Sequence, residues 1–221
     1  GASAKPLPGE EIAYTFETWG RQIADFCREV VGESAFLVGN SIGCIVAMQA
    51  AVDNPDIALG VALLNCSLRL LHERKQADLP YYRRMGAPLL QRILSIKSIG
   101  EFFFNQIAKP KTVRSILLQA YPTSEAVTDE LIDILMTPAR DPGAAAVFLA
   151  FTAYSQGPLA EDLLPVLPCP VIILWGTADP WEPIELGREL AKFPQVTKFI
   201  PLEGIGHCPQ DEAPELVNPK G

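Results

Sequence analysis

Short apolar runs alternate along the chain with segments in which apolar residues recur every three or four positions. The runs lie at residues 35–39, 59–64, 171–176 and 197–201, and each has the length and composition of a buried strand. A helix-forming segment follows the first run and extends to about Asn54. Strands that alternate with helices predict parallel βαβ units with both sheet faces covered. We therefore expect an α/β fold with a mostly parallel sheet.

Helical periodicity is clear near the start of the chain. From Thr15 onward, apolar residues recur at spacings of three and four, which predicts one amphipathic helix. We interpret Trp19 and Phe26 as core residues on its apolar stripe. Further helices are expected at residues 184–192 and from about Asp211 onward. The full stripe of the first helix is Phe16, Trp19, Ile23, Phe26 and Val30.

The middle of the chain has a different pattern, with several helical segments and almost no strand signal. These helices are expected at residues 88–97, 99–107, 112–121, 124–136 and 143–154. Loops beyond the carboxyl edge of a sheet accept insertions that carry specificity. We therefore expect a helical cap at residues 68–165, inserted into an α/β core that consists of residues 1–67 and 166–221.

Aromatic side chains are concentrated in this expected cap. They are Phe102, Phe103, Phe104, Phe148 and Phe151. One interpretation is that they pack the cap helices against each other. The other is that some of them, for which we select Phe102, Phe148 and Phe151, line a groove for a long apolar substrate.

Composition narrows the classes of function. A chain of 221 residues can bury one sizeable core, and its net charge of −8 argues against nucleic-acid partners, because phosphate binding needs clustered Lys and Arg. No apolar run reaches the roughly 18 residues that a membrane-spanning helix requires. The five cysteines are an odd number without Cys-x-x-Cys spacing, which favours reduced thiols in an intracellular compartment. No metal site and no cofactor are expected.

Between the first expected strand and its helix lies the motif Gly39-Asn40-Ser41-Ile42-Gly43. A Gly-x-Ser-x-Gly motif in the order strand, turn and helix is typical of a nucleophile elbow. The turn strains the serine backbone and lifts its Oγ clear of the sheet. We expect Gly39 and Gly43 to be the positions where a side chain would collide with the neighbouring strand or helix.

A serine hydroxyl needs an adjacent base, and the chain has two histidines. His72 lies among charged residues on what we interpret as a solvated cap segment. His207 follows a strand in a glycine-flanked loop, so we favour it as the base. Asp179 lies just past the strand 171–176, where a carboxylate can orient the imidazole. The order Ser41, Asp179, His207 is the one that the α/β-hydrolase fold imposes.

Acyl transfer also needs donors directed at the developing oxyanion. The backbone N–H of Ile42, at the start of a helix, is the expected first donor. The second donor normally comes from a glycine-rich loop after an earlier strand, and the sequence contains no such segment.

With these residues in place, the chain resembles the α/β-hydrolase superfamily, and within it the pheophytinase and chlorophyll dephytylase branch of plastids and cyanobacteria. Asn40 stands where other branches more often have histidine. The similarity extends over essentially the whole chain, and the residues after His207 are its most specific part. The segments that carry the resemblance are 39–43, 63–66, 126–131, 179–181, 206–212 and 214–218.

The resemblance implies Ser41 as nucleophile, His207 as base and Asp179 as orienting acid. It implies a phytyl ester of a chlorophyll-type pigment as substrate, with any metal belonging to the pigment. Asn40 and Trp181 are expected to bind this small-molecule, apolar ester together with the cap phenylalanines. The expected location is the chloroplast, and the alternative is the cytoplasm of a cyanobacterium or another cell. Peripheral contact with the thylakoid membrane is a further expectation that the resemblance leaves open.

Two departures from the family pattern set further expectations. Residues 1–6 resemble the segment after the fourth strand of the fold, so we expect the first strands and the oxyanion loop to be missing, leaving the strand 35–39 as an unprotected edge. Cys44 stands where many relatives have a second glycine, which narrows the space behind the elbow. Three alternative interpretations stay open: a general carboxylesterase or thioesterase, a ligand-binding receptor of hydrolase fold, and a catalytically inactive fragment.

Overall fold

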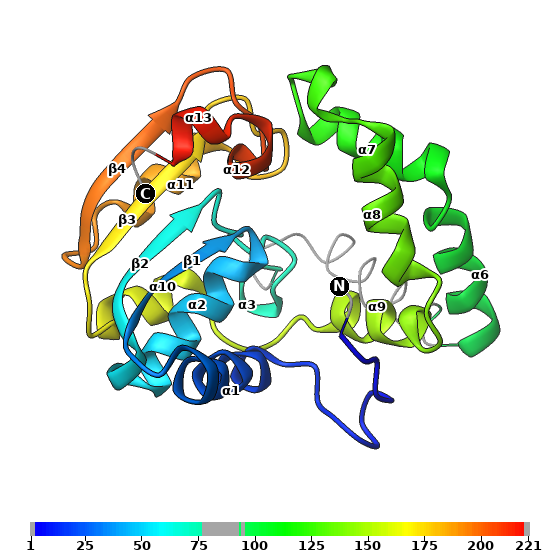
Figure 1. Ribbon diagram of the computed structural model, residues 1–221, viewed down its shortest axis with the longest axis horizontal. Coiled ribbons are helices and arrows are strands. Elements are labelled where there is room, and N and C mark those ends of the chain that lie inside the picture. The colour runs from blue at the N-terminus through cyan, green and yellow to red at the C-terminus, as the bar shows by residue number, and fades with distance from the viewer. Residues whose placement is uncertain (1–2, 77–92, 94–95, 219–221) are drawn as a thin grey trace. The chain divides into compact units, whose positions relative to one another are not determined.

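Four parallel strands, arranged in the order in which they occur along the chain, form the sheet. They are β1 (Ala35–Asn40), β2 (Ala58–Leu64), β3 (Val171–Gly176) and β4 (Val196–Leu202). The computed structural model describes residues 3–76, 93 and 96–218. The expected α/β fold with a parallel sheet is confirmed (Figure 1). Each expected strand lies within one or two residues of its predicted position.

The chain divides into two compact units. A sheet unit comprises Phe16–Leu68, Leu118–Ala126 and Pro158–Gly221. A helical unit comprises Gly1–Thr15, Arg69–Leu117 and Val127–Gly157. The candidate catalytic residues Ser41, Asp179 and His207 therefore all belong to the sheet unit.

Helices pack against both faces of the central strands of the sheet. On one face α2 (Ile42–Asp53) packs against β1 and β2, and α1 (Phe16–Phe26) and α10 (Ala160–Leu163) pack against α2. On the other face, Val217 of α13 (Pro214–Val217) and Ala213, which lies between α13 and α12 (Pro209–Glu212), join a buried cluster with side chains of β2, β3 and β4. Because both faces are covered, the central strands are continuous apolar runs rather than alternating ones. Also in the sheet unit is α11 (Ile184–Leu190), which contacts β3.

The contact between α1 and α2 corrects our interpretation of the apolar stripe. Phe16, Gly20 and Ala24 are the buried residues of α1, whereas Phe26 is 55% exposed. A Cβ on Gly20 would lie 3.2 Å from the backbone N of Ala50, so the two helices approach through small residues. The close approach turns the i, i+4 row of small side chains toward α2 and leaves Phe26 outside the core. Trp19 is half-buried, its ring edge-on to Phe16.

The turn between β1 and α2 has the strain expected of a nucleophile elbow. Ser41 has φ 53° and ψ −120°, a conformation that non-glycine residues rarely adopt. A Cβ on Gly39 would lie 2.4 Å from the carbonyl oxygen of Gly43, which confirms the expected collision at Gly39. The expectation for Gly43 is wrong, because a Cβ there would meet no heavy atom of the described residues within 4 Å.

The helical unit confirms the expected insertion of helices. It contains α6 (Lys97–Ile107), which packs against α9 (Ala144–Ala153), and α8 (Asp129–Ala139), which also contacts α9. The rings of Phe104 and Phe148 join α6 to α9 with centroids 5.4 Å apart. Within residues 68–165, α3 (Glu73–Gln76) also belongs to the helical unit, α7 (Pro110–Ala120) is divided between the two units, and the 3-10 turns at Ser124–Ala126 and Leu164–Val166 belong with α10 to the sheet unit. The helix expected at 88–97 lies almost wholly outside the described residues.

His72 is buried rather than solvated, so that expectation is wrong. It is 2% exposed, and its Nε2 lies 2.9 Å from the carbonyl oxygen of Gly157. Its Nδ1 accepts a hydrogen bond from the backbone N–H of Arg74, which makes Nε2 the protonated nitrogen. The segment folds back because the Arg69 guanidinium donates to the carbonyl oxygens of Tyr154 and Gln156. Both ring nitrogens of His72 thus have structural partners.

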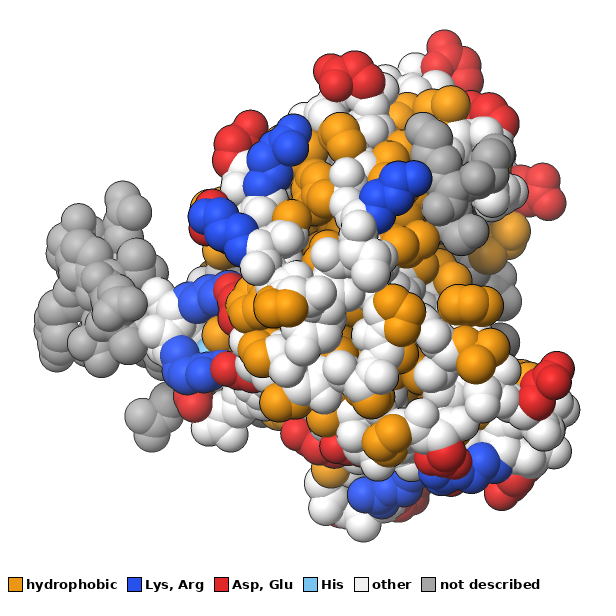
Figure 2. All heavy atoms as spheres, turned by 90° about the vertical axis from the view of Figure 1, so that its left-hand side faces the viewer, with side chains coloured by type: hydrophobic (Ala, Val, Ile, Leu, Met, Phe, Trp, Pro, Cys, Tyr) orange, Lys and Arg blue, Asp and Glu red, His pale blue; other side chains and the backbone are white. Residues whose placement is uncertain are grey.

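Strand β1 lies at one end of the strand order, as expected for residues 35–39. Its side chains Phe36 and Val38 are 71% and 64% exposed. Figure 2 shows that hydrophobic side chains are accessible over much of the face of the molecule drawn there, interspersed with charged ones.

Among the helices described, none combines the length and the apolar character needed to span a bilayer.

The two motif glycines provide a matched test of the elbow packing. We predict that Gly39→Ala lowers the free energy of unfolding by at least about 2 kcal/mol, because the added methyl overlaps the backbone of residue 43. Gly43→Ala should change it by less than about 1 kcal/mol, with helix propensity in its favour. Chemical denaturation of both variants measures this. Equal destabilisation by the two substitutions would contradict the conclusion that only Gly39 is closely packed.

The α1–α2 contact provides a second test. We predict that Gly20→Leu lowers the free energy of unfolding by about 1–3 kcal/mol, because its side chain must displace the backbone of α2. Gln22→Leu adds a leucine to an exposed position of the same helix and should stay within about 0.5 kcal/mol of the parent. Thermal and urea unfolding give both values, and a Gly20→Leu variant as stable as Gln22→Leu would refute the contact.

Candidate active site

A buried carboxylate–imidazole pair lies at the carboxyl ends of β3 and β4. Nδ1 of His207 lies 2.8 Å from Oδ2 of Asp179, and both side chains are buried. An ionised carboxylate can only accept, so Nδ1 carries the proton and donates it to Asp179. This leaves the lone pair on Nε2, the state in which an imidazole can act as a base.

Four hydrogen bonds hold the Asp179 carboxylate. Oδ2 accepts from His207 and from Nδ2 of Asn65 at 2.7 Å. Oδ1 accepts from the backbone N–H groups of Trp181 at 2.8 Å and Glu182 at 3.1 Å. Burial raises the pKa of the Asp179 carboxyl, but the hydrogen bonds from His207 and Asn65 outweigh it and leave the pKa below its ordinary value. Asp179 is therefore an anion positioned to orient the imidazole.

Asn65 is a site residue to which the sequence analysis assigned no role. It follows β2, is fully buried and has φ 43°. Besides Asp179, its amide contacts the carbonyl oxygen of Gly206 and the backbone N–H of Gly176. The only sequence signal for it was a polar residue at the carboxyl end of an apolar strand, within a segment quoted for the family resemblance.

A second buried acid supports the loop after Asp179. Glu182 accepts a hydrogen bond from Ser67 Oγ at 3.0 Å, and its carbonyl oxygen accepts from the indole N–H of Trp175 at 2.9 Å. Burial raises the pKa of the Glu182 carboxyl, and hydrogen bonds from Leu68 and Ser67 offset this only in part. These contacts fix the turn that presents Asp179.

The loop that carries His207 approaches the end of β3 very closely. A Cβ on Gly176 would lie 2.2 Å from the carbonyl oxygen of Gly206, so only glycine fits at this position. Glu212 accepts hydrogen bonds from the N–H groups of Gly206 and Thr123, at 2.8 and 2.9 Å. The His207 loop is thus held by its own downstream helix.

The elbow lies beside the His207 loop at the same edge of the sheet. Nδ2 of Asn40 donates to the carbonyl oxygens of His207 at 2.9 Å and Leu64 at 3.1 Å. The backbone N–H of Ser41 also donates to Leu64. Ile42 is the first residue of α2, where N–H groups have no acceptor within the helix. The structure joins Asp179 directly to His207 and joins the elbow to His207 through Asn40; the catalytic and oxyanion roles of these residues remain predictions.

The residues predicted to bind substrate fall into both units. In the sheet unit, the Trp181 ring is 41% exposed and its centroid lies 4.8 Å from that of His207. In the helical unit, Phe102 is exposed, Phe148 packs on Phe104, and Phe151 is half-buried. Contact of any of them with substrate remains a prediction.

The cysteines are free thiols. Cys44 is fully buried behind the elbow, and its Sγ donates to the carbonyl oxygen of Gly39 at 3.1 Å. The neighbouring Cys66 has its pKa raised well above the ordinary value by its hydrogen bond with Cys44 and by burial. In the described ranges, no three His, Cys, Asp or Glu side chains are grouped so that they could hold a metal ion.

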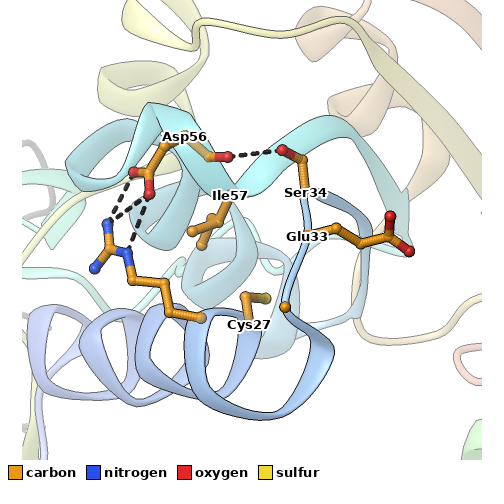
Figure 3. A pocket seen from close by; sticks show the side chains of 7 residues that line it. Cys27, Glu33, Ser34, Asp56 and Ile57 are labelled. Carbon is orange, nitrogen blue, oxygen red and sulfur yellow. Dashed lines mark hydrogen bonds and ion pairs between the residues drawn. The ribbon is translucent and has the colours of Figure 1, made fainter.

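A pocket occurs at the opposite edge of the sheet, at the amino ends of β1 and β2 (Figure 3). Arg28 and Asp56 within it are paired, with Nη2 2.8 Å from Oδ1 and Nε 3.1 Å from Oδ2. Ser34 Oγ donates to the carbonyl oxygen of Asp56. Since these polar groups bind each other, and the candidate catalytic residues lie at the carboxyl ends of the strands, we do not assign the reaction to this pocket.

Known proteins of similar sequence and fold were found for this chain. A chloroplastic pheophytinase of Arabidopsis thaliana is 28% identical over 215 residues, which are 95% of this chain and 44% of that protein. The uncharacterized hydrolase YugF of Bacillus subtilis is 23% identical, over 93% of this chain and 70% of its own. The structure of a thermophilic esterase from Thermogutta terrifontis superposes with a TM-score of 0.69 at 23% identity, over 99% of this chain and 73% of that one.

The chain thus spans less than half of the plant relative and about 70% of the others. The sequence profile of the alpha/beta hydrolase family matches residues 5–220, nearly the whole chain. The chain belongs to the alpha/beta hydrolase family.

Proposed function

We propose that this protein is a serine hydrolase that cleaves carboxylic esters. The observation that carries the proposal is the buried hydrogen bond between Asp179 and His207, at the same sheet edge as the strained Ser41. An anionic, fully hydrogen-bonded acid that holds an imidazole with its Nε2 lone pair free is the arrangement that a serine nucleophile requires.

In the proposed reaction, Nε2 of His207 takes the proton of Ser41 as Oγ attacks the ester carbonyl carbon. The developing oxyanion accepts a hydrogen bond from the N–H of Ile42, at the positive end of the α2 dipole. His207 then protonates the departing alcohol, which leaves an acyl group on Ser41. A water molecule, deprotonated by His207, then attacks the acyl carbon. The bond to Ser41 Oγ breaks, His207 returns the proton to Oγ, and the carboxylic acid leaves.

Within this class, we propose a phytyl ester of a chlorophyll-type pigment as the substrate. The support is the 28% identity to a protein named as a chloroplastic pheophytinase, together with the apolar side chains of the helical unit. Each methylene of an isoprenoid chain that these side chains bury would contribute about 0.8 kcal/mol to binding. Phe102, Phe148, Phe151 and Trp181 are the proposed contacts, and a chloroplast is the proposed location.

A general carboxylesterase is the second candidate. The observation in its favour is the similarity in fold to an esterase from Thermogutta terrifontis, which extends over nearly all of this chain. The two candidates share the chemistry of Ser41 and differ in the alcohol portion of the ester.

The nucleophile is tested first. We predict that Ser41→Ala lowers kcat for p-nitrophenyl butyrate by at least about 1,000-fold and abolishes labelling by a fluorophosphonate probe, because the nucleophile is gone. Ser34→Ala, at the other edge of the sheet, is the control and should retain both. Labelling or turnover that persists in Ser41→Ala would remove Ser41 from its proposed role.

The alcohol preference is tested with a series of prenyl esters of one pigment acid. If the phytyl chain is recognised, shortening the alcohol by one isoprene unit should lower kcat/KM by at least about 15-fold, since burial of only two of its five carbons already contributes about 1.6 kcal/mol at about 0.8 kcal/mol each. Release of the alcohol, followed by chromatography, gives the rates. A kcat/KM that is independent of chain length would favour the general carboxylesterase.

A further inference from the structure

Asn65 is a fully buried polar side chain whose hydrogen-bonding groups are all directed at the candidate catalytic residues or their neighbours. Nδ2 donates to Oδ2 of Asp179 at 2.7 Å and to the carbonyl oxygen of Gly206 at 3.2 Å. Oδ1 accepts from the backbone N–H of Gly176 at 3.1 Å. One amide thus joins the ends of β2 and β3 to the residue that precedes His207.

The chemistry of these partners fixes the orientation of the amide. The Asp179 oxygen and the Gly206 carbonyl can only accept, and the Gly176 N–H can only donate. Rotating the amide by 180° would direct its oxygen at two acceptors and its NH₂ at a donor. Asn65 therefore acts specifically as a donor toward Asp179.

The backbone of Asn65 is fixed as well. Its N–H donates to the carbonyl oxygen of Leu174 at 3.0 Å, and its φ of 43° lies in the left-handed region. Asparagine, aspartate and glycine tolerate this conformation better than other residues. The side chain cannot reach solvent, because Asn65 has no exposed surface.

We propose that Asn65 is a positioning residue for the Asp179–His207 pair. It donates to the same carboxylate oxygen that accepts from the imidazole, and so prevents the carboxylate from rotating away from His207. It also donates to the carbonyl oxygen of Gly206, which fixes the backbone position immediately before His207. The inference rests on the proposed function, since positioning matters for turnover only if His207 acts on Ser41.

Asn65→Asp is the most direct test. Aspartate keeps the shape and the tolerance for positive φ, but when ionised it replaces the donor facing Asp179 with an acceptor, so kcat is measured above the pH at which the two neighbouring carboxyl groups share a proton. We expect kcat for p-nitrophenyl butyrate to fall about 30-fold, equivalent to about 2 kcal/mol at 1.36 kcal/mol per factor of ten, with KM changed less than about twofold. Asn105→Asp adds the same charge at an exposed position and should match the parent.

A second readout does not depend on activity. The chain has two histidines, so ¹⁵N-imidazole NMR gives two sets of signals, with His72 as an internal reference. We expect neutral His207 to be the Nδ1–H tautomer in the parent, in Asn105→Asp and in Ser41→Ala, and to lose this preference in Asn65→Asp. The His72 signals should not change.

The outcomes separate the two proposals. Turnover that persists in Ser41→Ala would end the hydrolase proposal, and the tautomer of His207 would still decide the role of Asn65. If Asn65→Asp fails to fold, as judged by thermal unfolding, Asn65→Gly removes the donor without backbone strain and should show the same tautomer change. A folded variant at position 65 with parental kcat and parental tautomer would overturn the inference.

Discussion

The hydrogen bond between Asp179 and His207 is the constraint on which the rest of the site depends. An ionised carboxylate with its side chain fully buried is stable only if hydrogen bonds replace the water it has lost. Asp179 receives four, and two of them come from the imidazole and the amide of Asn65. Removing any donor would leave part of a buried negative charge without compensation. The positions of the residues that donate to Asp179 are therefore closely constrained.

The parallel sheet makes this arrangement possible. The carboxyl ends of parallel strands meet at one edge, so turns after β1, β2, β3 and β4 deliver Ser41, Asn65, Asp179 and His207 to neighbouring places. Because residue 176 is glycine, the end of β3 can lie against the loop that precedes His207 more closely than any side chain would permit. Asn40 and Asn65 then join the turns through side-chain amides. The site is thus held mainly by strand ends and by two buried or half-buried asparagines.

The strained backbone of Ser41 is likewise held by contacts at the carboxyl edge of the sheet. A serine at φ 53° is unfavourable by itself and persists because its surroundings determine it. Its N–H and carbonyl oxygen are bound by Leu64, Cys44 and Ser67, and α2 behind it is a largely buried helix. Packing of α1 against α2 through Gly20 holds the helix that begins at this turn, which links the stability of the fold to the proposed chemistry.

The sequence by itself determined the α/β class, the four strands, the helical insertion and the elbow, because hydrophobic periodicity and turn motifs are local properties. It also selected Asp179 and His207, since each follows a strand. Only the tertiary structure decided that Phe26 lies outside the core, that His72 is buried, and that Asn65 holds Asp179. Those outcomes depend on close helix approach and on contacts between residues far apart in the chain, such as the 114 positions between Asn65 and Asp179, and no local pattern encodes them.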